Sequence, residues 1–469
     1  MNEWFIWIVY AFLFGVGAVV PGLNTKASAA IIFFNVWIMA AKKRDRDIVL
    51  LSTFVLASEM LALMNIAVYA TYVFGKKLRA PTLRKYQLIT IGVVLLNSLL
   101  CASIYDTGWN LLLELLYLSI LVMTGFLISR DRIGEIRLAY ITKKFVLLEF
   151  ILTLFIVCRV RSFQPGDLYY GSMGNAHYFA NWLIIAILVL LCIEKRRMGH
   201  ICVAFRSLFF YVLITFIMIY LADAKILVLA LVCGVGFYGT LSLVVREHKR
   251  CFWALILMGT GLGAFMWIIY LPDVQKVLTR ISPTLSMYLY KNGWNVKFSY
   301  FRGTLFHSLT GIRFLIGYGL GQYGSRVANA FAYEVMWRNN NFVNRFISST
   351  FLSHYVPQFA KYMSMYTKDF VEEIRWRSGI LSYPFSSFIA IVAEYGMIGF
   401  VLLARMINRL TKKSICKIVI VYFSVACIFD LYFDNFQCVG IVLFYLCNTI
   451  SEREKVPEKK LIVNEGCMI

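Results

Sequence analysis

The sequence predicts an all-α polytopic membrane protein with about 12 to 14 transmembrane helices and one large, partly helical extracytoplasmic loop. Of the 469 residues, 60% are hydrophobic and only 15% are charged, whereas roughly 25% of residues are charged in an ordinary soluble domain. The apolar residues fall into blocks of about 17 to 25, the length that an α-helix needs to cross roughly 30 Å of hydrocarbon. Water is therefore not the main solvent of this chain.

The first apolar block, Phe5–Val20, is expected to be a retained helix and not a signal peptide. It lacks a basic leading region, and a second apolar block follows at once. In chain order the candidate spans are Phe5–Val20, Ala27–Ala41, Ile48–Phe74, Leu88–Ser103, Leu111–Ile128, Phe145–Cys158, Tyr178–Ile193, Leu208–Leu221, Ile226–Val245, Phe252–Leu271, Phe388–Leu403, Ile418–Phe429 and Val439–Ile450.

Short basic loops set the predicted orientation, because loops rich in Lys and Arg stay in the cytoplasm. These loops, with their net charges, are Lys76–Lys85 (+5), Arg130–Lys144 (+3), Glu194–Arg206 (+3), Arg246–Arg250 (+2) and Arg405–Lys417 (+5). The alternate loops carry little net charge and are expected to face outward. One exception is Lys42–Asp47, which is also basic although a single apolar block separates it from the next basic loop. Either Ile48–Phe74 is a hairpin bent around Glu59, or the N-terminus lies outside.

A long segment, Asp273–Tyr383, interrupts the apolar pattern and is extracytoplasmic by the alternation. It holds 13 basic and 5 acidic residues, a net charge of +8, which predicts an anionic partner. The chain then divides into an N-terminal helix bundle (1–272), a large outer loop (273–387), C-terminal transmembrane helices (388–450) and a cytoplasmic tail (451–469).

The overall charge does not predict a nucleic-acid partner. The 47 Lys and Arg exceed the 25 Asp and Glu by 22, which in a soluble protein would suggest nucleic acid. In a membrane protein such an excess marks cytoplasmic loops. Most of the 11 cysteines lie inside apolar blocks, with no disulfide framework or metal-ligand spacing, so no metal is expected.

Two outward-facing loops carry candidate functional groups. The first holds Arg159 and Arg161, followed by YYGSMGNAHYFAN, in which glycines and an asparagine signal a turn before a helix and His177 lies at that helix's outer end. This histidine is either catalytic or a hydrogen-bonded structural residue. The second loop is LADAK, Leu221–Lys225, where Lys225 either reaches a phosphate as a point charge or belongs to a solvated turn.

The third candidate is FRGTLFHSLTGIRFLIGYGLGQYGSR, Phe301–Arg326. Its closely spaced glycines let backbone amides approach a ligand, and its arginines can each place two hydrogen bonds on phosphate oxygens. It is not a P-loop, because no Lys-Ser/Thr follows the glycines. Further along, Glu394 interrupts the apolar helix Pro384–Ala404. An ionisable group at that depth is either functional or the structural partner of an arginine.

These four stretches, in this order, resemble the O-antigen ligase and Wzy-type polysaccharide polymerase superfamily, whose fold is GT-C-like. Arg159 to Asn181 is similar to the family's outward loop with arginines and a Gly-Asn turn, and Lys225 to its short basic turn. Arg302 to Gly321 is similar to the arginine and G-x-G-x-G segment of its large loop, and Glu394, Gly396 and Gly399 to its E-x-G-x-x-G pattern. Many members have a His-Asn pair where this chain has Ser386 and Ser387. The polymerase branch therefore fits better than the ligase branch.

The resemblance implies glycosyl transfer between two undecaprenyl-diphosphate-linked oligosaccharides, a donor and an acceptor, on the outer face of the bacterial cytoplasmic membrane. It needs no cofactor, because diphosphate is a good leaving group once cations neutralise its charge. Partners implied are membrane lipids, a chain-length regulator and a flippase. We expect the diphosphate to be bound by Arg159, Arg161, Lys225, Arg302, Arg313 and Arg326, with backbone approach at Gly317, Gly319 and Gly321. The base that takes the acceptor's proton is sought among His177, His307, His354 and Glu394.

Other classes predict different features. A lipid-linked oligosaccharide flippase would share the compartment and the substrate without catalysis, but such transporters are usually built from repeats with short loops, and no repeat relates the two halves here. An ion-coupled transporter should place several carboxylates in the membrane, and only Glu59, Glu114, Glu149 and Glu394 qualify. A ligase-type transferase to another acceptor is the remaining alternative. A polyprenyl-monophosphate-sugar transferase would need acidic residues in the first outward loop, PGLNTK, which has none.

Overall fold

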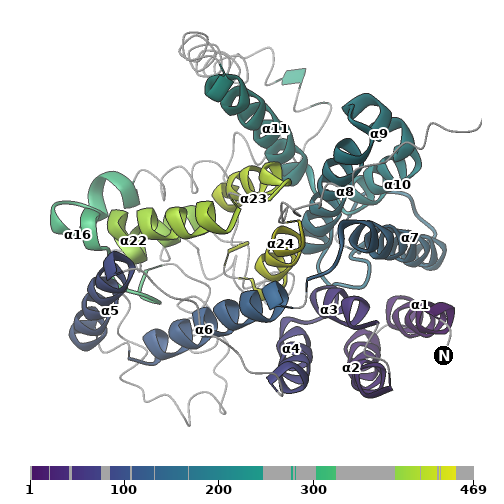
Figure 1. The fold of residues 1–469 in the computed structure, drawn as a ribbon, viewed down its shortest axis with the longest axis horizontal. Coiled ribbons are helices and arrows are strands. Elements are labelled where there is room, and N and C mark those ends of the chain that lie inside the picture. Colours follow the sequence, from purple (N-terminus) through teal and green to yellow (C-terminus); the bar gives the residue numbers. More distant parts are fainter. Residues whose placement is uncertain are drawn as a thin grey trace, which may run out of the picture.

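The structure is a computed structural model of the 469-residue chain. It describes residues 3–20, 22–41, 45–74, 85–105, 108–130, 132–166, 168–246, 276–277, 280, 303–323, 386–411, 414–429, 432–433 and 435–449. The elements in these ranges are helices (Figure 1). They are α1 (Glu3–Val19), α2 (Asn24–Ala41), α3 (Arg46–Phe54), α4 (Glu59–Phe74), α5 (Lys85–Tyr105), α6 (Gly108–Arg130), α7 (Glu135–Val160), α8 (Ala176–Met198), α9 (Ile201–Ser207), α10 (Phe209–Leu221), α11 (Lys225–Arg246), the π-helix η3 (Gly303–Ser308), α16 (Ile312–Ile316), α22 (Ser387–Thr411), α23 (Lys417–Phe429) and α24 (Phe436–Asn448).

The predicted apolar blocks coincide with these helices, except for Phe252–Leu271, which lies outside the described residues. Among the described residues, three helices are long and apolar enough to cross a membrane, namely α6 over Leu111–Arg130, α8, and α22 over Ser387–Met406. The pair α9 and α10, bent by 73°, makes a fourth if it is one span. Within the described residues the fold is helical, and these apolar helices indicate a membrane protein. The larger number of spans and the large outer loop stay predictions.

The core is centred on α8 and α24. Every residue from Tyr178 to Leu190 on α8 is buried, including the ring of Trp182, which is fully enclosed. α24 lies near the middle of the bundle, with α5 and α16 on one side and α1, α2 and α7 on the other (Figure 1). Polar and ionisable side chains that enter this core therefore need partners from the protein.

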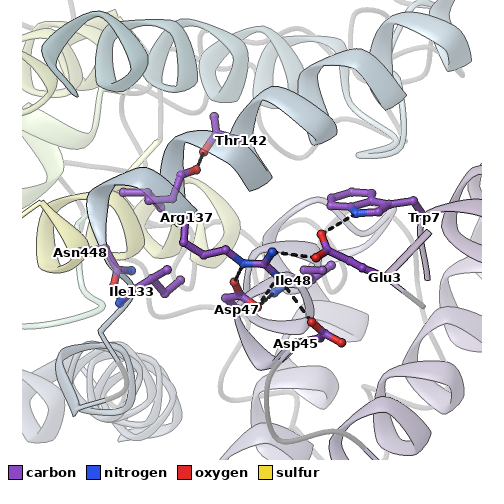
Figure 2. A network of polar contacts seen from close by, with 10 residues as sticks. Glu3, Trp7, Asp45, Asp47, Ile48, Ile133, Arg137, Thr142 and Asn448 are labelled. Atoms are coloured by element: carbon purple, nitrogen blue, oxygen red, sulfur yellow. Dashed lines mark hydrogen bonds and ion pairs between the residues drawn. The ribbon is translucent and has the colours of Figure 1, made fainter. Parts of the chain in front are cut away.

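One end of the bundle is held by Arg137 in the first turn of α7, and we call it the Arg137 end. The guanidinium donates to Asp47 at 2.5 Å and to Glu3 at 2.8 Å, and lies 3.5 Å from Asp45 (Figure 2). These contacts join the start of α1, the α2–α3 connection and the start of α7. The end of α24 lies here too, because the Asn448 side chain accepts from the backbone N–H that precedes α7 at 2.8 Å.

The opposite end is held by Ser172 in the α7–α8 connection, and we call it the Ser172 end. Ser172 Oγ lies 2.6 Å from the carbonyl of Val55, just past the end of α3. The last turn of α1 is also at this end, because Arg159 of α7 donates to the Ala18 carbonyl at 2.9 Å. The start of α24 joins them through a 2.7 Å hydrogen bond from the Phe436 N–H to the Glu59 carboxylate.

The block Ile48–Phe74 is a hairpin of two helices, α3 and α4. Asn65 on α4 donates to Thr53 near the end of α3 at 2.6 Å, so α4 runs back beside α3. Asn35 of α2 also bonds Asn65 and Ser52, at 3.2 and 3.1 Å. Of the two alternatives that the sequence left open, this geometry favours the hairpin bent around Glu59.

Part of the predicted outer loop packs against two helices at the edge of the bundle (Figure 1). Residues 303–323, which the sequence places in the loop 273–387, lie against α5 and α22. Asn97, in the middle of α5, donates to the Ile316 and Gly317 carbonyls at 2.9 and 3.3 Å. Irregular backbone between helices of a membrane protein is tolerated where it is enclosed by protein or lines a cavity.

Candidate functional site

The loop after α7 begins with two of the predicted arginines. Half-buried Arg159 donates to the carbonyls of Ala18 and Val19, at 2.9 and 3.3 Å. These are among the last carbonyls of α1, where the negative end of the helix dipole favours a cation. Arg161 ends α7 in the left-handed conformation, with φ of 53°, and is exposed. Arg159 therefore has a structural contact, while Arg161 faces the surroundings.

A glycine turn then leads into α8 and needs glycine at two positions. Gly171 and Gly174 have φ of 53° and 70°, which residues with a Cβ rarely adopt. A Cβ on Gly171 would lie 2.4 Å from a Glu149 carboxylate oxygen, and one on Gly174 would lie 2.6 Å from the Ala57 carbonyl. The turn is thus clamped between α7 and the α3–α4 hairpin. Asn175 follows and caps α8 by accepting from an N–H of its first turn at 3.0 Å.

Glu149 holds this turn from the middle of α7. The side chain is fully buried, and its Oε2 accepts the backbone N–H of Ser172 at 3.0 Å. Its Oε1 is hydrogen-bonded to the Ser172 hydroxyl, which also lies 2.6 Å from the Val55 carbonyl. One carboxyl group therefore fixes both the backbone and the side chain of the turn.

His177 lies two residues past the Asn175 cap, in the first turn of α8, and is half-buried. Next to it, the ring of Tyr178 meets the ring of Tyr432 edge to face, with centroids 6.3 Å apart. His177 is therefore at the Ser172 end, close to the connection between α23 and α24.

The LADAK turn adjoins the loop after α7. The N–H of Gly166 donates to the carbonyl of Leu221, at the end of α10, over 2.9 Å. Asp223 takes a positive φ of 51° in the turn, and α11 begins at Lys225, whose side chain lies outside the described part of the chain. Arg159, Arg161, His177 and Lys225 thus come from adjoining segments at one end of the bundle.

Two further helices, α22 and α24, begin at this same end. The N–H of Phe433, in the connection before α24, donates to Ser387 Oγ at the start of α22 over 3.0 Å, and the edge-to-face contact of Tyr432 reaches α8. The start of α24 already receives a negative charge, since the Glu59 carboxylate accepts from Phe436 N–H. Helix N-termini favour anions because their N–H groups and dipoles point outward. Ser386 and Ser387 stand where many members of the family have a His-Asn pair. Ser386 caps α22, and its hydroxyl donates to the Cys427 carbonyl at 3.0 Å.

The second group of predicted residues surrounds a break in α22. Gly396 has φ of 65° and ψ of 178° inside this helix. The buried Glu394 lies two residues before this break. The two Glu394 oxygens accept backbone N–H groups of Gly321 and Tyr323, at 2.7 and 3.0 Å. The carboxylate therefore holds the glycine segment against the broken helix.

The glycines of this segment approach α22 itself. Gly319 N–H donates to the Glu394 carbonyl at 3.0 Å. A Cβ on Gly317 would lie 2.5 Å from that carbonyl, and a Cβ on Gly396 would lie 2.3 Å from the Leu315 carbonyl. The amides of Gly319 and Gly321 are therefore used within the protein in this structure. We call this set, Arg313, Gly317, Gly319, Gly321, Glu394 and Gly396, the Glu394 cluster.

Arg313 is part of the Glu394 cluster. It donates to Cys101 Sγ of α5 at 3.0 Å and to the Gly317 carbonyl at 3.2 Å, and its guanidinium lies over the Tyr318 ring at 5.2 Å. His307 is exposed on the π-helix η3 nearby. Arg302, Arg326 and His354 lie outside the described residues.

An open groove runs between α5 and α22 beyond the helix break. Its lining is mostly apolar, with one guanidinium, and consists of Thr90, Met397, Ile398, Val401, Leu402 and Arg405. Within the described residues, no three His, Cys, Asp or Glu side chains are grouped so as to hold a metal ion.

Compared with protein-family models and with curated proteins, the chain has no match. The resemblance to the polymerase superfamily consequently rests on the order and spacing of the four motifs.

The structure divides the predicted site residues into two groups and adds residues that the sequence did not single out for the site. Arg159, Arg161, His177 and Lys225 belong to segments of the Ser172 end, whereas Arg313, the three glycines and Glu394 form the Glu394 cluster. Glu149 and Ser172 were missed. The signal for Glu149 was a carboxylate in the middle of an apolar block, and for Ser172 a hydroxyl between two glycines of a turn.

Proposed function

We propose that this protein is a polysaccharide polymerase, a metal-independent glycosyltransferase of the cytoplasmic membrane. It transfers a growing glycan from undecaprenyl diphosphate to a lipid-linked repeat unit on the outer face. The supporting observation is the neighbourhood at the Ser172 end, where the Arg159–Arg161 loop, the turn before His177 and the start of α11 at Lys225 adjoin one another. These segments make up two of the four motifs that carry the resemblance.

The proposed topology has the Arg137 end in the cytoplasm and the Ser172 end outside. With α3 and α4 as a hairpin that returns to its own side, the basic loop Lys42–Asp47 and the basic loop Lys76–Lys85 lie on one side, as the positive-inside rule requires. Counting Phe252–Leu271 as a span, the chain crosses about twelve times, with both termini in the cytoplasm.

In the proposed reaction, an acceptor hydroxyl oxygen attacks the anomeric carbon of the donor glycan. The bond from that carbon to the diphosphate oxygen breaks, and undecaprenyl diphosphate leaves with the electron pair. Arg161, Lys225 and the N-termini of α8 and α22 neutralise the leaving charge. The apolar groove between α5 and α22 suits an isoprenoid chain.

His177 is the proposed base for the acceptor proton. It is half-buried beside the basic loop, whereas both oxygens of Glu394 accept backbone N–H groups and His307 is exposed on η3. Glu394 is then a residue that fixes the glycine segment, and His354 stays a candidate on sequence grounds.

The test is a reconstitution. The protein is purified into lipid with the undecaprenyl-diphosphate repeat unit of its own host, and product size is followed on a gel for wild type and His177→Ala. His200→Ala is the matched control, because this exposed histidine precedes α9 at the other end of α8. We expect a ladder of multimers from wild type and the control and its loss in His177→Ala and in Arg302→Ala.

Three other outcomes would contradict this reading. A ladder that survives His177→Ala removes His177 as the base. Passage of the lipid-linked unit across vesicles without a ladder makes the protein a flippase. Transfer of a single unit to an unrelated acceptor makes it a ligase-type enzyme.

A further inference from the structure

If Glu149 were ionised, the group of oxygens around Ser172 would lack one hydrogen for the hydrogen bonds that its contacts require. Ser172 Oγ contacts both Glu149 Oε1 and the Val55 carbonyl, but a hydroxyl has one hydrogen to donate. With an ionised Glu149, one of these contacts would bring two acceptor oxygens together. With a protonated Glu149, the acid donates to Ser172 Oγ and Ser172 donates to Val55, so every contact is a hydrogen bond.

The Val55 carbonyl is the fixed point of this chain of hydrogen bonds. Val55 is the C-cap of α3, and the hairpin bends immediately after it. A buried carbonyl at a helix end needs a donor from elsewhere. The Ser172 hydroxyl is that donor. Because its one hydrogen is used on Val55, the hydrogen between Ser172 Oγ and Glu149 Oε1 must come from Glu149.

Charge compensation gives the same result. Among the ion pairs of the described residues, none includes Glu149, which has no exposed surface. A buried ionised carboxylate without a cation is strongly unfavourable. The Ser172 N–H bonded to Oε2 is compatible with the neutral acid, because that oxygen keeps its lone pairs.

We propose that Glu149 is a neutral positioning residue, which fixes the turn before α8 and thereby the place of His177. This rests on the function proposed above. The turn is held on one face by Glu149 and on the other by the hairpin, where Gly174 has no room for a side chain beside Ala57. His177 is only five residues beyond Ser172, and the cap at Asn175 makes the first turn of α8 follow the turn rigidly.

Glutamine separates a neutral role from an ionised one. In Glu149→Gln, the amide oxygen accepts from Ser172 N–H and the amide nitrogen donates to Ser172 Oγ, so the network is preserved. We expect kcat within about threefold of wild type for Glu149→Gln, and a kcat at least about tenfold lower, with little change of KM, for Glu149→Ala. Loss of activity in the glutamine variant would overturn the proposal, because it would require an ionised carboxylate.

Two measurements do not depend on the reaction. An infrared difference spectrum between wild type and Glu149→Gln should contain the C=O stretch of a protonated carboxylic acid, and only carboxylate bands would overturn the proposal. Hydrogen–deuterium exchange at residues 171–177 should rise in Glu149→Ala and stay at the wild-type level in Glu149→Gln; equal exchange in all three proteins would also overturn it. If the acid band and this exchange pattern appear but wild type makes no polymer, the neutral clamp stands and the proposed function fails.

Discussion

The Ser172 end and the Glu394 cluster both use a buried glutamate to hold an irregular segment in place, but the hydrogen-bond patterns around the two glutamates differ. In each, a buried glutamate from an apolar helix fixes an irregular segment containing glycines. Glu394 accepts backbone N–H groups on both oxygens. Glu149 accepts one N–H and meets a hydroxyl that is committed to a carbonyl. The pattern around Glu394 suits a carboxylate, and the pattern around Glu149 suits the neutral acid.

This difference shows that the charge state of a buried glutamate depends on how many N–H and O–H hydrogens its neighbours can donate to it. Burial is nearly the same for the two residues, at 1% exposed for Glu394 and 0% for Glu149. Burial alone therefore cannot separate the two states. Substitution by glutamine can, because it keeps shape while changing one acceptor into a donor.

The largest effect is expected from Gly396→Ala at the break of α22. Its Cβ would lie 2.3 Å from the Leu315 carbonyl and the position has a positive φ, so backbone must move. We expect the free energy of unfolding to fall by about 3 kcal/mol or more. Gly92→Ala on α5 is the control, because its Cβ would meet nothing within 4 Å. Equal stability of both variants in thermal unfolding would mean that the break is not rigid.

Glu394→Gln should cost about 1 to 3 kcal/mol of unfolding free energy, because its amide nitrogen would face a backbone N–H of the glycine segment. The measurement is equilibrium unfolding in mixed micelles. Wild-type stability in this variant would contradict the carboxylate assignment and remove the contrast with Glu149.

Ser172→Ala should cost about 1 to 2 kcal/mol, because the Val55 carbonyl and Glu149 both lose their partner. Ser119→Ala serves as control, since its exposed hydroxyl bonds only a carbonyl of its own helix, at 2.7 Å. If both serine variants unfold alike, Ser172 is not a link between the hairpin and α7.

The smallest effect is expected from Glu149→Gln, which preserves all three contacts. The free energy of unfolding should change by less than about 1 kcal/mol. A cost equal to that of Glu394→Gln in the same micelles would show that the two glutamates have the same charge state.

The sequence was sufficient for features that depend on local pattern. Apolar length located the helices, and the Gly-Asn turn located the start of α8, because Asn175 supplies the cap and the glycines supply positive φ. The contact of the glycine segment with α22 was not predictable in this way. Gly321 and Glu394 are 73 residues apart, and the sequence around one residue does not predict a contact with the other.

The sequence left the break after α3 open as one of two alternatives, and it hid the break in α22. Only a few polar residues, among them Ser58 and Glu59 near Val55 and Glu394 near Gly396, interrupt these apolar stretches, so mean hydropathy stays high through both bends. Each break is stabilised by groups from distant segments, namely Ser172 for the first and the glycine segment for the second. The sequence could therefore offer a bend around Glu59 as one of two alternatives, and it placed Glu394 in an apolar helix without showing that the helix is broken there.

The α3–α4 hairpin also affects how the fold can change over time. Because the chain enters and leaves it at the same end of the bundle, the hairpin does not alter the direction of any later helix. A gene can gain, shorten or replace such an element without turning the downstream half of the protein inside out. Loss of a single ordinary span would invert every loop that follows it. The length of the hairpin therefore has no effect on which side of the membrane the later loops face.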